Sequence, residues 1–315
     1  MTAVDRGDRD ACMSEDLTLD VFVIGGVGID TIVRVPELPL PAVETIHVDP
    51  VESYLGHTGH GVALGCHSLG LQTALADVIG DDPEGKRIRQ AYAKLGVPLT
   101  YGIHPSGTRR SVNLVSPDGS RVSLYDARHP EGMVVTADLW RPGVELARHV
   151  HVSIVDFARQ ALEDTTAARC TVSTDLHDWD GDNEFHWDFA QAADLVFLST
   201  SALTEPVEDV AGRIFKRGRA SAVIAMAGSE GSHLMVRDQD PVAVPAVEIP
   251  DRPVVDTNGA GDAYVSGFLA RWLDGASWQD AATAGSVAGA WACGSPGTHT
   301  DLIPAEKLYT LTRPA

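Results

Sequence analysis

Short runs of apolar, mostly β-branched residues alternate along the chain with segments in which apolar residues recur at helical spacing. This alternation is typical of a mainly parallel sheet whose faces are covered by helices. Several of the runs are continuously apolar, as expected for strands that are buried on both faces. We predict strands at residues 19–24, 73–79, 149–155, 170–174, 194–198, 222–226 and 253–255. The chain is therefore expected to adopt an α/β fold with a mainly parallel central sheet.

The ends of two helices can be predicted from capping residues. Asp82 followed by Pro83 favours a helix start, because proline is well accepted at the first helical position, and Gly96 favours its end. Ser277, with Asp280 three residues later, predicts the start of a second helix. Each predicted helix has an apolar face that can pack on the sheet.

Two stretches interrupt the alternation. Residues 31–48 are extended and punctuated by proline, and residues 98–127 contain two short alternating runs around the turn Pro117-Asp118-Gly119. Strands with one apolar and one polar face are typical of antiparallel pairs. We predict a small β-sheet that is inserted into the main domain and assembled from these two segments. It would serve as a lid over a ligand cleft, or it would be a plain surface hairpin.

The net charge of −20 in 315 residues disfavours nucleic acid and anionic lipid as partners. Phosphate backbones require a basic surface that releases counterions. No apolar run approaches the ~20 residues of a membrane-spanning helix, so we expect no membrane partner either. Small phosphorylated ligands stay open, because local dipoles can bind a phosphate on an acidic protein.

Residues 1–18 are polar and lack the apolar core of a signal peptide. We expect them to be a disordered N-terminal extension in front of a domain at residues 19–315. The four cysteines, at positions 12, 66, 170 and 293, form no CxxC pair. This pattern favours a reduced, cytoplasmic protein.

The segment at residues 254–262 leads from a predicted strand through a loop of small residues into a helix. Gly259, Ala260 and Gly261 would present unpaired N–H groups at the positive end of the helix dipole, which suits an anion. Asp262 would lie in the first turn beside that anion. The pair suits phosphoryl transfer to an alcohol, with Asp262 accepting the hydroxyl proton. The alternative is a tight strand–helix turn with Asp262 as an N-terminal charge.

The signature DTNGAGD at residues 256–262 resembles that of the ribokinase-like (pfkB) carbohydrate kinases, and the resemblance extends from residue 21 to residue 304. It implies a three-layer ribokinase-like fold in which the inserted sheet is a lid. It also implies an ATP-dependent carbohydrate kinase with ATP and Mg²⁺ as cofactors, and leaves a monovalent cation open. Asp262 would be the catalytic base, and the backbone of Gly259, Ala260 and Gly261 would be the anion hole.

Further matches imply where the nucleotide and the sugar would bind. The turn at residues 228–231 follows a predicted strand, as the nucleotide-contacting turn of this family does, and residues 286–298 resemble its adenine side. The implied nucleotide-binding residues are Gly228, Ser229, Gly231, Thr257, Asn258, Ser286 and Gly289. The implied sugar-binding residues are Asp30, His57, Gly59, His60, Gly61 and Asp262.

Two segments depart from the family pattern. In the sugar motif, His57 stands where the family has a second glycine, and Gly61 stands where it has asparagine. His57 and His60 would bind an unusual substrate, or would be neutral polar groups at a helix start.

Residues 199–202 read Ser-Thr-Ser-Ala where the family has Asn-x-x-Glu, which organises magnesium through water. Glu205, about one helical turn further on, could compensate.

The sequence thus predicts a phosphotransferase that moves the γ-phosphate of ATP to a hydroxyl of a sugar or a related small molecule. A nucleoside kinase of the same family, or a ligand-binding homologue with weak catalysis, remains open. The lid strands could also pair with a second copy to form a homodimer. Asp175, which ends a predicted strand, is expected to border the substrate cleft.

Overall fold

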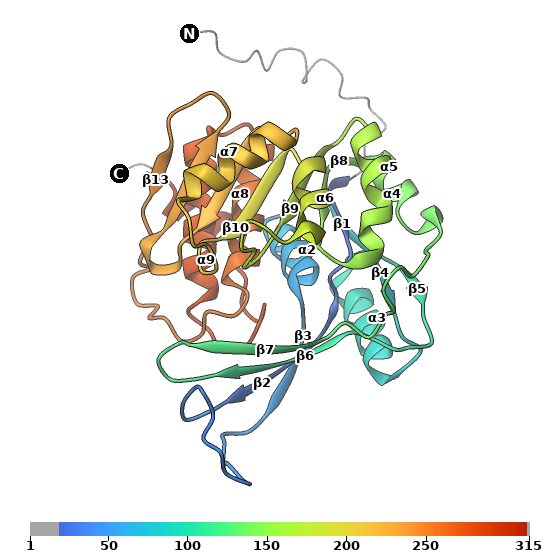
Figure 1. Cartoon of the computed structure of the whole chain (residues 1–315), viewed down its shortest axis with the longest axis vertical. Coiled ribbons are helices and arrows are strands. Elements are labelled where there is room, and N and C mark those ends of the chain that lie inside the picture. The colour runs from blue at the N-terminus through green and yellow to red at the C-terminus, as the bar shows by residue number, and fades with distance from the viewer. Residues whose placement is uncertain (1–18, 314–315) are drawn as a thin grey trace.

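The computed structural model describes residues 19–313 (Figure 1), and the larger of its two sheets has nine strands. Their order is β13-β12-β11-β10-β9-β8-β1-β4-β5. Neighbours are parallel from β5 to β11, while β12 and β13 are antiparallel. The strands are β1 (Leu19–Ile24), β4 (Thr73–Ile79), β5 (Leu99–Ile103), β8 (Ala147–Val152), β9 (Thr171–Asp175), β10 (Leu195–Ser199), β11 (Ala222–Met226), β12 (Ser232–Val236) and β13 (Val242–Val244).

Helices cover both faces of this sheet, which confirms the expected three-layer α/β fold. One face packs against α4 (Arg141–Leu146), α5 (Leu162–Ala167), α6 (Glu184–Ala192) and α7 (Val207–Arg217). The other packs against α2 (Thr58–Ser68), α3 (Pro83–Leu95), α8 (Ala260–Leu273) and α9 (Trp278–Ala292), with α10 (Ala305–Leu311) beside α9. Successive side chains of a strand point to opposite faces. In β1, accordingly, Phe22 and Ile24 join the first core, whereas Val21 and Val23 join the second.

The predicted helix caps are confirmed. The side chain of Asp82 accepts a hydrogen bond from Gly85 N at 2.8 Å, and Gly96 closes α3 in the left-handed region. Ser277 caps α9 by accepting from Asp280 N at 3.1 Å. Three short 3₁₀ turns complete the described elements: Ala137–Leu139, Asp156–Ala161 and Gly228–Glu230. None of the helices between residues 19 and 313 is long and apolar enough to cross a membrane.

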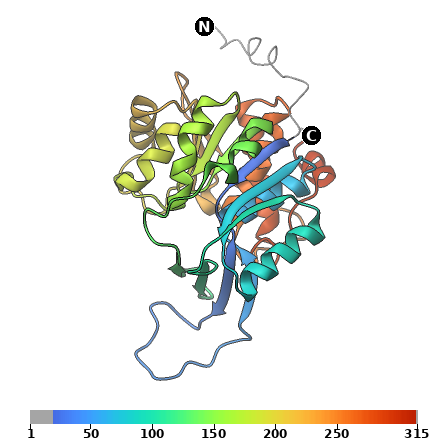
Figure 2. The ribbon, with the colours of Figure 1, turned by 90° about the vertical axis from the view of Figure 1, so that its right-hand side faces the viewer.

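The second sheet has the strand order β3-β2-β6-β7 and projects from one end of the main domain (Figure 2). β2 pairs in parallel with β6 and antiparallel with β3, and β6 and β7 form an antiparallel hairpin. The strands are β2 (Gly28–Arg34), β3 (Glu52–Gly56), β6 (Arg110–Val115) and β7 (Arg121–Asp126). The predicted hairpin around residues 117–119 is therefore present.

The predicted strand positions need three corrections. Residues 35–51 contain no strand, because their prolines, at 36, 39, 41 and 50, lack the N–H that a sheet needs. β5 lies on the edge of the main sheet rather than in the lid. Residues 253–255 also form no strand. Val254 is 72% exposed, and Val255 N bonds to the carbonyl of Cys293 beyond α9. The predicted disordered extension at residues 1–18 lies outside the described residues.

Candidate active site

Several elements meet where the parallel strands of the main sheet end. Gly26, which follows β1, lies so close to α2 that a Cβ on it would stand 2.6 Å from Gly59 N. Met226, the last residue of β11, lies against the first turn of α8, since a Cβ on Gly261 would stand 3.7 Å from its Cε. In open α/β sheets, ligands bind at this carboxyl edge. The arrangement brings the predicted sugar-binding and anion-binding segments together.

The N-terminus of α8 is built to receive an anion. Gly259 adopts φ 77°, a left-handed conformation that favours glycine, and the helix begins at Ala260. No side chain caps this end. Ala260 N donates to the Thr257 carbonyl at 3.3 Å, and the N–H groups of Gly261 and Asp262 have no acceptor inside the helix. α9 packs closely here, because Gly289 lets its backbone approach the Ala260 carbonyl. The result is a bare helix N-terminus with a positive partial charge.

Asp262 lies in the first turn of α8 and is 7% exposed. Its Oδ2 lies 2.7 Å from Nε2 of His299, a residue of the loop between α9 and α10. The side chain of His299 is 2% exposed. Sequence reasoning identified Asp262 but missed His299, because no helical or strand periodicity marks a single histidine in a loop.

Asp30, the predicted sugar-binding carboxylate, lies on β2. Its Oδ2 accepts the backbone N–H of His57 at 3.2 Å, its Oδ1 lies 3.3 Å from His57 Nε2, and Ser111 on β6 donates its hydroxyl. Burial alone would raise the pKa of Asp30, but the hydrogen bonds and charge of His57 and the bond from Ser111 outweigh it and hold that pKa well below its usual range. Asp30 is thus a buried, ionised carboxylate, and His57 lies beside it.

His60 and Gly59 have structural partners. His60 Nδ1 lies 3.0 Å from the hydroxyl of Tyr92 on α3, and its ring centroid lies 5.6 Å from that of His299. Burial, with His299 adding to the effect, holds the pKa of His60 well below its ordinary value, so its imidazole is neutral. Gly59 has no room for a side chain, since a Cβ would collide with the carbonyl of Gly25.

The predicted nucleotide-binding turn follows β11. Gly228 and Gly231 both adopt positive φ, and a Cβ on Gly231 would collide with the Val244 carbonyl. Next to this turn, the hydroxyls of Ser232 and Tyr264 lie 2.8 Å apart and join β12 to α8. Ser286 is buried on α9, and Thr257 is exposed in the loop before α8. The turn and the anion-binding helix therefore lie on neighbouring elements.

Two arginines of the second sheet, the predicted lid (β3-β2-β6-β7), contact the loop before α8. Arg34 on β2 donates to Asp256 Oδ2 at 2.6 Å, and Arg121 on β7 donates to Asn258 Oδ1 at 2.8 Å. The other end of the Asn258 amide donates to Asp256 Oδ1 at 2.6 Å. The side chain of Asn258 thus joins the lid to the loop, a role that its place in the signature did not suggest.

A further carboxylate, Asp175, ends β9 and is 4% exposed. Its Oδ1 accepts the backbone N–H of His177 at 2.9 Å. Burial raises the pKa of Asp175, and the nearby charge of Asp262 adds to the rise against the opposing effect of His177. The expectation that Asp175 borders the cleft fits this interaction with Asp262.

Glu205 does not fit the magnesium role expected of it. Both of its carboxylate oxygens accept hydrogen bonds from Arg213, each at 2.6 Å. Arg213 also donates a hydrogen bond to the Gly181 carbonyl, next to this bidentate ion pair. Because each carboxylate oxygen already bonds the guanidinium of Arg213, we do not include Glu205 in the proposed magnesium site.

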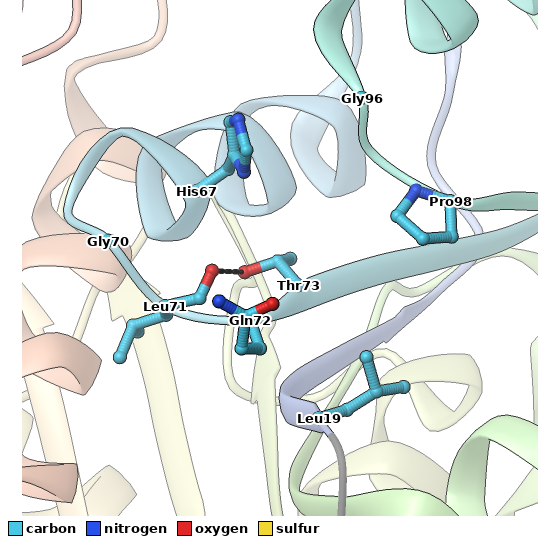
Figure 3. Close-up of a pocket in the computed structure, with 8 residues that line it drawn as sticks. All are labelled: Leu19, His67, Gly70, Leu71, Gln72, Thr73, Gly96 and Pro98. Atoms are coloured by element: carbon cyan, nitrogen blue, oxygen red, sulfur yellow. Dashed lines mark hydrogen bonds between the residues drawn. The ribbon is translucent and has the colours of Figure 1, made fainter.

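One surface pocket lies away from this site. Figure 3 shows it between Leu19, at the start of β1, and the segment that leads into β4. It therefore lies at the amino ends of these strands, opposite the edge that carries Asp262. A second pocket borders the site, because its lining includes Tyr54, Arg87, His60 and His299.

A family model described as pfkB family carbohydrate kinase matches residues 18–174 and 184–306. An acarbose 7(IV)-phosphotransferase from an Actinoplanes species is 45% identical over 297 residues, which cover 94% of this chain and 98% of that protein. The solved structure of a microbiome-derived acarbose kinase is 53% identical, with a TM-score of 0.88, and the match covers 93% of this chain and 99% of that one.

More distant structures share the fold. The ribokinase of Arabidopsis thaliana, solved with ribose and ATP, is 19% identical with a TM-score of 0.78. That match covers 95% of this chain and 100% of the ribokinase. At this identity the likeness concerns the fold alone.

Proposed function

The chain belongs to the pfkB family of carbohydrate kinases and is an ATP-dependent sugar kinase, and we propose that its acceptor is acarbose or a closely related compound. Two relatives whose names refer to acarbose support this choice of substrate. They are 45% and 53% identical to this chain over nearly its whole length. The nucleoside kinase among the relatives is 24% identical, which favours a sugar over a nucleoside.

Asp262 is the proposed base. Its carboxylate lies in the first turn of α8, beside the N–H groups that would hold the transferred phosphoryl group. As the acceptor oxygen bonds to the γ-phosphorus, Asp262 would take the hydroxyl proton and the bond from phosphorus to the β–γ bridging oxygen would break, which releases ADP. The backbone at Gly259, Ala260 and Gly261 would stabilise the charge on the phosphoryl oxygens.

The described residues fit ATP and magnesium. The bare N-terminus of α8 suits a phosphate, and the turn at Gly228–Glu230 lies next to it for the rest of the nucleotide. Among residues 19–313, no group of three or more His, Cys, Asp and Glu side chains could hold a metal by itself. That fits magnesium, which keeps several waters and binds largely through substrate phosphates. When bound, magnesium supplies positive charge that offsets the phosphates and the Asp175–Asp262 repulsion.

We include no monovalent cation in the proposal. In the loop before α8, the buried carboxylate of Asp256 is the group that would attract such a cation. Its side chain is 1% exposed and already pairs with the guanidinium of Arg34. The positive charge at this position therefore comes from the chain itself.

The sugar would lie between the lid and the carboxyl edge of the main sheet. Asp30 and His57 are the proposed contacts to its hydroxyl groups, because an ionised buried carboxylate is a strong acceptor. His60 and Gly61 would line the floor of this site, with His60 held by Tyr92. Lid closure would exclude water and limit futile ATP hydrolysis.

The test is ADP release with acarbose, ribose, fructose and a nucleoside as acceptors. We expect acarbose to give the highest kcat/KM. Asp262→Asn should lower kcat by about 10²–10⁴-fold while ATP binding, followed by calorimetry, is retained. A preference for ribose or the nucleoside would overturn the substrate, and full activity of Asp262→Asn would overturn the base. Tight acarbose binding without ADP formation would instead favour the ligand-binding homologue.

Two further expectations belong to this proposal. β7 is an edge strand that exposes Val122, Leu124 and Tyr125, so we propose a homodimer through the lid, to be checked by analytical ultracentrifugation of Leu124→Lys against the unchanged protein. The enzyme would work in the reducing cytoplasm, where ATP is available. Cys66, Cys170 and Cys293 are free thiols, which suits that compartment.

A further inference from the structure

We propose that His299 is the positioning residue of the base: it donates a hydrogen bond from Nε2 to Oδ2 of Asp262 and leaves Oδ1 for the hydroxyl of the acceptor. This inference rests on the proposed function of Asp262. It starts from the 2.7 Å contact between the two side chains, one on α8 and the other in the loop between α9 and α10. Because a carboxylate only accepts hydrogen bonds, the shared proton comes from the imidazole.

The imidazole of His299 is held between two glycines. A Cβ on Gly61, in α2, would collide with Nε2 of His299 and would stand 2.6 Å from Cβ of Asp262. A Cβ on Gly259 would stand 2.7 Å from Cδ2 of His299. The ring therefore occupies space that side chains at these two positions would otherwise take. This accounts for Gly61, which departs from the family pattern in the sequence.

The loop that carries His299 is fixed to the main domain. Arg252 donates to Asp301 Oδ2 at 2.6 Å and to the Trp291 carbonyl at 2.8 Å, which anchors both sides of the loop. Gly297 N donates to Asp256 Oδ2 at 3.2 Å and ties the loop to the segment before α8. His299 itself adopts φ 54°, a conformation that is costly for a residue with a side chain and persists where its surroundings enforce it. The ring is thus placed by the fold.

A donor at Oδ2 has one direct consequence for a carboxylate base. It fixes the rotation of the carboxylate, so that Oδ1 keeps one direction toward the acceptor hydroxyl. The imidazole keeps its own proton throughout the transfer.

The groups that face His299 set the limits of this effect. His60, from α2, is neutral, so it adds no charge beside the pair. Asp30 and His57 interact with His60, and Tyr54 and Arg87 line the pocket that His299 borders. The charge of Asp175 acts on the partner of His299, Asp262. Within this set, Asp262 is the group that hydrogen-bonds the imidazole.

The experiment compares His299→Ala, His299→Gln and Gly61→Ala with the unchanged enzyme, using acarbose and MgATP. In glutamine, Nε2 follows Cβ by the same number of bonds as in histidine, so His299→Gln keeps a donor within reach. We expect His299→Ala to lower kcat by about 10²-fold with little change in the KM for ATP, because misplacement of a base costs rate rather than nucleotide binding. His299→Gln should recover most of that loss. Gly61→Ala should also lower kcat, since its methyl group would collide with both the imidazole ring and Asp262.

Two readouts separate positioning from a general loss of structure. The loss in His299→Ala should fall on kcat, while the KM for ATP and the thermal midpoint stay near their original values, because a misplaced base leaves nucleotide binding intact. Free imidazole should partly restore the activity of His299→Ala, since His299 borders a surface pocket that leads to the vacated space. The matched control is His67→Gln, at the exposed end of α2, which should leave all values unchanged.

The outcomes distinguish this inference from the function on which it rests. If the unchanged enzyme phosphorylates acarbose and Asp262→Asn is inactive, the function stands. In that case, His299→Ala with a normal kcat would overturn the positioning role. Equal losses in His299→Ala and His299→Gln, with an unchanged thermal midpoint and no rescue by imidazole, would overturn it as well. If the unchanged enzyme shows no phosphotransfer, the proposed function fails first.

Discussion

The guanidinium of Arg34, on lid strand β2, lies 2.6 Å from Oδ2 of Asp256, although the two residues are 222 positions apart. The same carboxylate accepts the backbone N–H groups of Asn258 at 3.0 Å and Gly297 at 3.2 Å. One buried side chain therefore joins the lid, the loop before α8 and the loop that carries His299. Any movement of the lid is expected to be felt at the phosphate-binding end of α8.

Loss of the Arg34 charge should weaken ATP binding. In Arg34→Met, the buried carboxylate of Asp256 would lack its cation and would repel the phosphates held by the neighbouring helix N-terminus. We expect the Kd for ATP to rise about tenfold, to be measured by calorimetry. The double variant Arg34→Met/Asp256→Asn should recover part of this loss, because it removes the unpaired charge. Arg128→Met, which breaks an ion pair within the lid, is the control. No recovery in the double variant would argue against a charge effect.

The buried pair of Arg109 and Asp77 should be important for stability. Arg109 precedes β6 and Asp77 lies on β4, so the pair ties the lid to the main sheet, and the two side chains are 3% and 0% exposed. The backbone N–H of Val27 also donates to Asp77, at 2.6 Å. We expect Arg109→Met to lower the free energy of unfolding by about 3–5 kcal/mol, because it leaves a buried carboxylate without its cation. Urea unfolding measures this change.

The comparison for that experiment is Arg128→Met, whose partner Asp126 is 49% exposed. Surface pairs of this kind contribute about 0–1 kcal/mol. A loss in Arg109→Met no larger than in Arg128→Met would contradict the importance of the buried pair.

Acidification should destabilise the protein through two histidines in the main sheet. Burial lowers the pKa of His149 to about 3, with His151 adding to it, and burial likewise lowers that of His151 to about 3, with His177 adding to it. In the unfolded chain both have pKa values near 6.5. The unfolded state therefore binds more protons, and stability that is fully present above pH 6.5 is lost as the pH falls toward 3.

Each such histidine contributes up to about 1.4 kcal/mol per pH unit to this slope. In His151→Gln the slope of the unfolding free energy between pH 6 and 4 should decrease by up to one proton. Denaturant unfolding at a series of pH values gives the slope. The exposed His47 is the matched control, and His47→Gln should keep the original slope. An unchanged slope in His151→Gln would mean that this imidazole is protonated in the folded state.

Glu205 should be dispensable for the use of magnesium. Since both of its oxygens bond Arg213, Glu205→Gln should leave the magnesium concentration for half-maximal activity within about twofold of its original value. A coupled assay of ADP formation across a magnesium titration gives this concentration. A severalfold increase would restore Glu205 as a magnesium-handling residue.

The fold was largely predictable because its signals are local. Continuous apolar runs identified β1, β4 and β11, and capping residues identified the ends of α3 and the start of α9. The failure at residues 253–255 has another origin than the prolines of residues 35–51. Val254 and Val255 are β-branched, yet no strand among the described residues pairs with them, and strand propensity gives no information about pairing partners.

The sequence by itself determined the local geometry of the proposed phosphoryl-transfer segment. A bare glycine-rich turn, a helix and an aspartate in its first turn lie within one short segment, so their relative geometry follows from the backbone. Only the tertiary structure decided what surrounds Asp262. His299 reaches it from 37 positions away, and Arg34 reaches the same loop from the lid, because packing depends on which surfaces meet in space. In the sequence, Gly61 is only a departure from the family pattern. In the fold, its lack of a side chain leaves the space that the imidazole of His299 occupies.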